Sequence, residues 1–118
     1  MPSVTILWED GTRSPAVLPI PELVPEAVLA VALSDFSGAP ERDVPVFALR
    51  ATQDALEARS VRAMVRAMGR GESMAHAPIL VVEYGAARYV RDGHHRLAAR
   101  CIAGEPTIRA RVLALDPA

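Results

Sequence analysis

The sequence Tyr-Val-Arg-Asp-Gly-His-His-Arg-Leu-Ala-Ala, residues 89–99, decides the fold because it joins a strand to a helix through a single glycine. An apolar, β-type stretch ends at Val90, and residues 97–103 have helical spacing. Gly93 therefore lies where the chain turns into a helix N-terminus. Such a terminus presents unpaired backbone N–H groups and the positive end of the helix dipole, which together favour a phosphate or another anion.

Length and composition limit the classes of protein that this chain can be. With 118 residues we expect a single domain over 1–118, with an N-terminal hairpin and helix in residues 1–43 and the core in residues 44–115. We expect a cytoplasmic protein without a membrane partner, because no apolar run approaches the roughly 20 residues that span a bilayer and the first residues do not resemble a signal peptide. The lone Cys101 excludes an internal disulfide and a thiolate-rich metal site.

The formal net charge of −1 hides an asymmetry along the chain. Residues 1–49 hold two arginines and seven acids, a net of −5, whereas residues 50–118 hold eleven arginines and seven acids, a net of +4. The small overall charge argues against a protein that coats nucleic acid indiscriminately. The part of the chain that contains Gly93 is nevertheless the part suited to an anionic partner.

Periodicity and turn residues predict the other elements. Asp10-Gly11 is typical of a hairpin turn, Pro25 suits the first turn of a helix, and Thr52 is a candidate N-cap. The predicted strands are at residues 3–8, 14–18, 44–49, 78–82, 87–90 and 107–115, and the predicted helices at 25–36, 53–68 and 97–103.

The predicted helix at 53–68 carries a basic stripe. Arg59, Arg62 and Arg66 recur at spacings of three and four, which places them along one side of the helix. Such a stripe either follows a nucleic-acid backbone or is a solvated helix face. No aromatic residue accompanies it, so the sequence gives no support for stacking on bases.

The order of the motifs in this chain resembles the order found in the ParB/sulfiredoxin superfamily. The resemblance covers residues 44–115 and rests on Ala51-Thr52-Gln53 before a helix, Pro78-Ile79-x-Val81, a glycine turn, Tyr89-Val90, and residues 92–99. It implies a small α+β domain with a mixed sheet flanked by helices. It also implies that the strand-to-helix turn at Gly93 binds nucleotide phosphates.

Departures from the superfamily patterns narrow what the resemblance implies. His94 stands where sulfiredoxins have their catalytic cysteine, so sulfiredoxin activity is excluded. Only Gly93 and Arg96 match the Gly-Glu-Arg-Arg type turn of chromosome-partition ParB proteins. The Asp-Gly-His-His-Arg spelling is more similar to the branch of ADP-dependent free serine kinases and phage or plasmid ParB-like nuclease domains.

The resemblance implies roles for individual residues of the turn. Gly93, His95 and Arg96 match the phosphate-binding positions, and Gln53 matches a glutamine that is common at a helix start in ParB-like chains. Asp92 and His94 match the His-His branch alone and are the candidate catalytic residues.

The role of Asp92 stays open on physical grounds. A carboxylate at this terminus repels a bound phosphate, unless it holds Mg²⁺ or turns away to orient a histidine. It is equally a helix cap without a further role. His94 is either a general acid or base or a residue packed near Leu97 and Ala98.

The expected function is nucleotide binding with Mg²⁺-assisted phosphoryl transfer or hydrolysis at residues 92–96. ADP, ATP and CTP are the candidate nucleotides, and Glu72, Glu83 and Asp92 are the candidate general bases. One alternative is a DNA nuclease that uses the stripe of Arg59, Arg62 and Arg66. The other is a non-catalytic phage or plasmid accessory module that binds a nucleotide or a partner.

Overall fold

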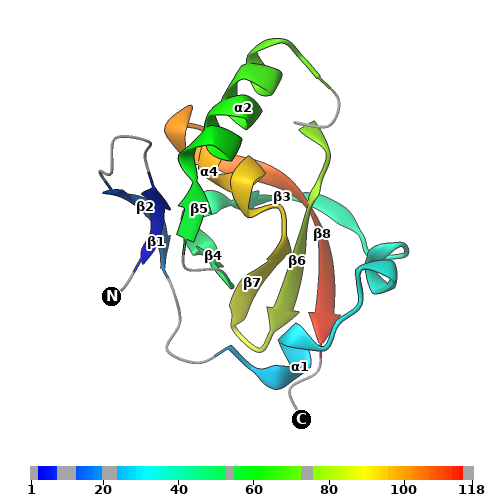
Figure 1. Cartoon of the computed structure of the whole chain (residues 1–118). Helices are drawn as coiled ribbons and strands as arrows, with labels where there is room; N and C mark the ends of the chain where they lie inside the picture. The colour runs from blue at the N-terminus through cyan, green and yellow to red at the C-terminus, as the bar shows by residue number, and fades with distance from the viewer. Residues whose placement is uncertain (1–2, 8–12, 20–23, 53–54, 73–75, 116–118) are drawn as a thin grey trace.

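The chain forms two β-sheets with helices packed on the larger one (Figure 1). A computed structural model describes residues 3–7, 13–19, 24–52, 55–72 and 76–115. Within these residues no helix is long and apolar enough to cross a membrane.

The larger sheet is mixed and has the strand order β3-β8-β6-β7-β4. Strand β6 pairs antiparallel with β7 and parallel with β8, while β3 pairs antiparallel with β8 and β4 parallel with β7. This mixed sheet with flanking helices confirms the predicted α+β class. Its strands are β3 (Glu41–Pro45), β4 (Leu49–Arg50), β6 (Ile79–Tyr84), β7 (Ala87–Asp92) and β8 (Thr107–Leu115).

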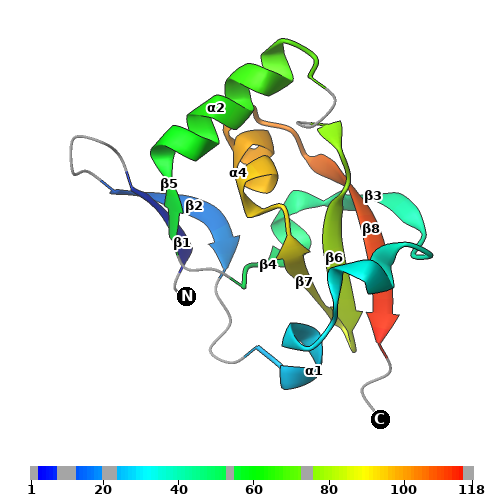
Figure 2. The ribbon, with the colours of Figure 1, turned by 45° about the vertical axis from the view of Figure 1, so that its right-hand side comes forward.

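Each face of this sheet carries its own hydrophobic core, because neighbouring residues of a strand point to opposite faces. Helices α2 (Ala58–Gly69) and α4 (His94–Ile102) cover one face, and the buried residues there include Ile79, Val81 and Leu97. The other face is covered by α1 (Glu26–Leu29) and the 3₁₀ turn η1 (Leu33–Phe36). Figure 2 shows α2 and α4 together on one side of the sheet and α1 near its lower end.

The smaller sheet has the order β2-β1-β5 and is built from β1 (Ser3–Leu7), β2 (Arg13–Pro19) and β5 (Ala55–Glu57). Strands β1 and β2 pair antiparallel, which confirms the predicted hairpin, while its Asp10-Gly11 turn lies outside the described residues. Strand β5 pairs parallel with β1. Strand β2 also lies beside β4 and α4.

The predicted helix at 53–68 was wrong at its start. Residues 55–57 form β5 instead, and α2 begins only at Ala58. Pairing with the distant strand β1 prevails here over local helix propensity. Thr52 is therefore not the N-cap of α2, and the predicted helix end at residue 68 agrees with the observed end at Gly69 within one residue.

Two other predicted elements were also wrong in part. The helix expected at 25–36 ends at Leu29, and a second turn, η1, begins where the Asp35 carboxylate accepts a hydrogen bond of 3.0 Å from the backbone N–H of Ala32. The strand expected at 44–49 is interrupted by the 3₁₀ turn Val46–Ala48, which carries the chain from β3 at one edge of the sheet to β4 at the other. The strands predicted at 78–82, 87–90 and 107–115 and the helix predicted after Gly93 are confirmed.

Candidate functional site

Gly93 makes the junction between β7 and α4 possible. It is the N-cap of α4 and has φ 104° and ψ 23°, a left-handed conformation that favours glycine. A Cβ atom at this position would lie 2.8 Å from Cβ of Ile79 and closer still to Cγ2 of that residue. As a glycine, this N-cap residue has no side chain with which to cap the helix start. The first N–H groups of α4 have no acceptor within the helix, and such groups suit an anion.

His94 is a buried residue of the first turn of α4, with 4% of its surface exposed. Its Nε2 accepts a hydrogen bond of 3.0 Å from the backbone N–H of Thr52. An accepting Nε2 carries no proton, so the ring is neutral and its proton is on Nδ1. Burial, together with the nearby His95, lowers the pKa of His94 to about 4, and Asp92 opposes the shift.

Thr52 fastens the segment after β4 to this turn. Its Oγ1 donates a hydrogen bond of 2.7 Å to the carbonyl of Val90 in β7. The 3.4 Å approach of Oγ1 to Nε2 of His94 adds a close contact only, because the hydroxyl has a single proton and gives it to Val90. We call the contacts of Thr52 with His94 and Val90 the Thr52 clasp. Sequence reasoning missed it, since a threonine before a predicted helix favours capping.

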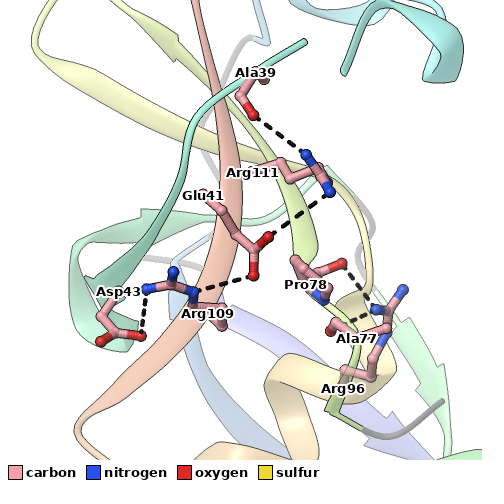
Figure 3. A network of polar contacts seen from close by, with 8 residues as sticks. All are labelled: Ala39, Glu41, Asp43, Ala77, Pro78, Arg96, Arg109 and Arg111. Atoms are coloured by element: carbon pink, nitrogen blue, oxygen red, sulfur yellow. Dashed lines mark hydrogen bonds and ion pairs between the residues drawn. The ribbon is translucent and has the colours of Figure 1, made fainter. Parts of the chain in front are cut away.

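Arg96 ties α4 to the chain that leads into β6 (Figure 3). Its Nη1 donates to the carbonyls of Ala77 and Pro78, at 2.7 Å and 2.9 Å. Its Nη2 lies 3.5 Å from Oδ2 of Asp92, and only 17% of its side chain is exposed. No local pattern in the sequence predicts these carbonyl contacts. Arg96 was predicted to bind a phosphate, but its Nη1 is therefore occupied by contacts within the protein.

Asp92 and His95 are the more accessible members of the turn. Asp92 is the last residue of β7, and its side chain is 51% exposed. His95 is half-buried in the first turn of α4. The predicted residues 92–96 thus lie together, as consecutive residues around the start of α4, with His94 turned into the core.

A second contact lies farther along α4. Arg100 Nη2 lies 3.2 Å from Nδ1 of the exposed His76, in the loop before β6. Cys101, in the same turn of the helix, packs against the core, and burial raises the pKa of its thiol. That raised pKa disfavours the thiolate that a nucleophilic role would need.

The other predicted site residues lie apart from the turn or outside the description. Arg59 and Arg66 are exposed on α2 and Arg62 is half-buried. Gln53 is outside the described residues, although the Thr52 clasp holds its neighbour against β7 and α4. Its predicted contact with a nucleotide stays a prediction.

Two of the three candidate general bases are paired with arginines from outside the turn. Glu83 accepts hydrogen bonds from Arg42 at 3.2 Å and Arg88 at 3.0 Å, and it lies four residues along β6 from Ile79, about 13 Å at the rise of a strand. Glu72 pairs with Arg70 at 3.2 Å. Asp92 is the candidate that lies at the turn itself.

Asp92 would have to hold a metal ion with few other protein ligands. Among the described residues, no group of three or more His, Cys, Asp and Glu side chains is placed to hold one. A site built from one carboxylate and substrate phosphates is typical of Mg²⁺, which keeps several of its waters. The exposed Asp92 beside an uncapped helix start fits that mode of binding.

Solved structures share the fold of this chain, whereas no family model and no curated protein matches it. Sulfiredoxin from Arabidopsis thaliana matches with a TM-score of 0.53 and 22% identity, over 65% of this chain and 88% of that protein. The C-terminally truncated chromosome-partitioning protein ParB from Caulobacter crescentus, complexed with CTP-γ-S, matches with a TM-score of 0.53 and 20% identity, over 65% of this chain. The chain has the ParB/sulfiredoxin fold.

The match to ParB is confined to one part of that protein. It spans 46% of the ParB chain in the CTP-γ-S complex, and 40% of the ParB chain complexed to the centromeric parS site, where the TM-score is 0.50 and the identity 23%. The prediction of a ParB/sulfiredoxin-like fold is confirmed. The narrower prediction of an Asp-Gly-His-His-Arg branch stays a prediction.

Proposed function

We propose that the turn from Asp92 to Arg96 binds the phosphates of a nucleotide. The observation that carries this proposal is the left-handed Gly93, which packs on Ile79 and opens α4 without a side-chain cap. Uncapped N–H groups at the positive end of a helix suit phosphate oxygens. The complex of a ParB of the same fold with CTP-γ-S supports a nucleotide as the ligand, with CTP, ATP and ADP as candidates.

The side chains at and around the turn have different roles in this proposal. His95, half-buried in the first turn of α4, supplies a donor next to the backbone N–H groups. Arg96 contributes mainly its charge, because its Nη1 is already bonded to Ala77 and Pro78. The Thr52 clasp holds the segment after β4 against the turn.

Catalysis adds two further requirements. Mg²⁺-assisted phosphoryl transfer or hydrolysis would use Asp92 as the metal-binding carboxylate, and the bound ion would offset the charge of the phosphates. A general acid or base role through Nε2 of the buried His94 requires that atom to leave Thr52. This burial favours a non-catalytic nucleotide-binding module as the second candidate. A DNA nuclease, also expected from the sequence, would use the same turn on a phosphodiester.

Isothermal titration calorimetry with CTP, ATP and ADP, each with and without Mg²⁺, tests the binding site. We expect one of these nucleotides to bind, and His95→Ala to weaken its binding about tenfold, which corresponds to about 1.4 kcal/mol. His76→Ala is the matched control, because it removes another accessible histidine from outside the turn, and it should change the Kd less than about twofold. No binding of any of the three nucleotides, or equal losses in both variants, contradicts the proposal.

The sign of the effect of Asp92→Asn tests the role of the metal. Without Mg²⁺ the substitution removes a repulsive charge, so the nucleotide should bind more tightly. With Mg²⁺ it removes a ligand, so binding should weaken and any nucleotide turnover should fall. Tighter binding under both conditions would exclude a metal-binding role for Asp92.

A further inference from the structure

Helix α2 presents a row of arginines to solvent, on the side away from the core. Arg59 and Arg66 are exposed, as are Arg70 and the intervening Ala63, whereas Val61 is buried. Arg70 extends the helical turn, since its N–H donates to the carbonyl of Arg66 at 3.0 Å. At 100° per residue, positions 59, 66 and 70 lie within about 40° of one another around the helix axis. We call Arg59, Arg66 and Arg70 the arginine face.

This arrangement of charge works against the stability of α2. The first turn of the helix contains Arg59 and no acidic residue, although a helix N-terminus favours negative charge. Arg66 and Arg70 are like charges four residues apart, a pairing that costs an isolated helix about 0.2–0.5 kcal/mol. Charge arranged against local preference is expected where a surface has a function.

The carboxylate of Glu72, which pairs with Arg70, offsets little of the charge of the arginine face. Arg70 pairs with Glu72 at 3.2 Å, but the two side chains are 61% and 46% exposed. An exposed pair of this kind contributes about 0–1 kcal/mol and exchanges readily with another anion. By contrast, Arg109 contacts both Glu41 at 3.1 Å and Asp43 at 3.6 Å on the β3–β8 part of the sheet (Figure 3).

The spacing of the arginine face suits a regular row of phosphates. At a rise of about 1.5 Å per residue, Arg59 and Arg66 are about 10 Å apart along the axis, and Arg70 is about 6 Å farther on. A nucleic-acid duplex offers a phosphate about every 3.4 Å per strand, so a face of this length meets several of them. Neither α2 nor α4 contains a phenylalanine, tyrosine or tryptophan, the usual platform for the stacked bases of a single strand.

We propose that the arginine face binds the phosphate backbone of a nucleic-acid duplex, without reading its sequence. The interaction is separate from the turn at Gly93 and does not depend on nucleotide binding there. Guanidinium groups suit phosphate oxygens in geometry as well as in charge. Since backbone contacts carry no sequence information, duplexes of unrelated sequence should bind with similar affinity.

Fluorescence anisotropy with labelled DNA and RNA duplexes of about 20 base pairs tests this proposal. Binding should weaken with salt, and neutralising three phosphates corresponds to a slope of log K against log salt of about −2.7. R59Q/R66Q/R70Q should weaken binding at least about tenfold at low salt and flatten that slope by about 2.7. The triple variant R42Q/R109Q/R111Q is the matched control, because it removes the same charge from arginines that are paired with carboxylates on the sheet.

The outcomes separate this surface from the site at Gly93. A loss confined to R59Q/R66Q/R70Q, with circular dichroism and nucleotide binding unchanged, supports the proposal. Equal losses in both triple variants would reduce it to an effect of net charge and overturn it. Absence of duplex binding at low salt, or stronger binding of a single strand of the same sequence, would overturn it as well.

Discussion

At the scale of single residues, Gly93 and His94 determine the shape of the turn. Gly93 allows a left-handed backbone next to Ile79. The neutral imidazole of His94 points into the core, where it accepts a hydrogen bond from the backbone N–H of Thr52. The need for glycine could be predicted from its place between strand and helix. The direction of His94 could not, because adjacent residues of a helix point about 100° apart and packing decides which of them is buried.

Gly93→Ala should lower the free energy of unfolding by about 2–5 kcal/mol. The estimate adds the cost of a left-handed alanine, about 1–2 kcal/mol, to that of forcing a methyl group against Ile79, about 1–3 kcal/mol. Urea denaturation measures it. Gly104→Ala is the control, since Gly104 has φ 76° but its Cβ would meet nothing within 4 Å. Equal losses in both variants would show that Ile79 does not restrict this position.

His94 should make the protein less stable in mild acid. Its pKa is 6.5 when unfolded and about 4 when folded, so between these values the unfolded chain binds a proton that the folded chain does not. The free energy of unfolding should therefore fall as the pH drops from 6.5 to about 4, by up to about 3 kcal/mol. Urea denaturation of the wild type and of His94→Gln at several pH values measures this contribution. The variant keeps the carboxylates, so the difference between the two proteins removes their effect on stability. A variant with the same pH profile as the wild type would contradict it.

At the scale of elements, side-chain bonds to the backbone hold α4 in place. Arg96 bonds it to the residues before β6, and the Thr52 clasp bonds its first turn to the segment after β4. The sequence predicted α4 and its neighbouring strands well, because strand alternation and a glycine turn are local signals. It misplaced the start of α2, because β5 exists only through its pairing with the distant β1.

Arg96→Ala should loosen the contact between α4 and β6. It leaves the carbonyls of Ala77 and Pro78 without their charged donor, a loss of about 2–4 kcal/mol. Chemical denaturation should show this loss, and hydrogen exchange should quicken in α4 and at the start of β6. Arg100→Ala, which removes one contact with an exposed histidine, should cost less than about 1 kcal/mol. If the two variants are equally stable, Arg96 serves the phosphate alone.

At the scale of the whole molecule, the five-stranded sheet separates two cores. The turn at Gly93 belongs to the core under α2 and α4, whereas Phe36 closes the core on the other face. Arg91 links β7 to that second face through a hydrogen bond of 3.1 Å to the carbonyl of Val31. We therefore expect the second core to support stability more than ligand binding.

Phe36→Ala should lower the free energy of unfolding by about 3–5 kcal/mol, because Phe36 is 1% exposed. Under conditions in which the variant remains folded, nucleotide affinity at the turn should stay within about twofold. Leu33→Ala in the same 3₁₀ turn is the control, since Leu33 is 54% exposed and its loss should cost about 0.5 kcal/mol or less. A large loss of affinity in folded Phe36→Ala would show that the two faces are coupled.

The sequence by itself determined the strands around Gly93 and the helix that follows them, because each depends on periodicity and turn residues close together in the chain. Only the tertiary structure decided what the residues of the turn contact. Thr52 and His94 are 42 positions apart, and Arg96 is 18 and 19 positions from the carbonyls it meets. Such contacts depend on how the elements pack, which local spacing does not encode. Packing thus turned His94 inward and left Asp92 at the surface beside an uncapped helix start.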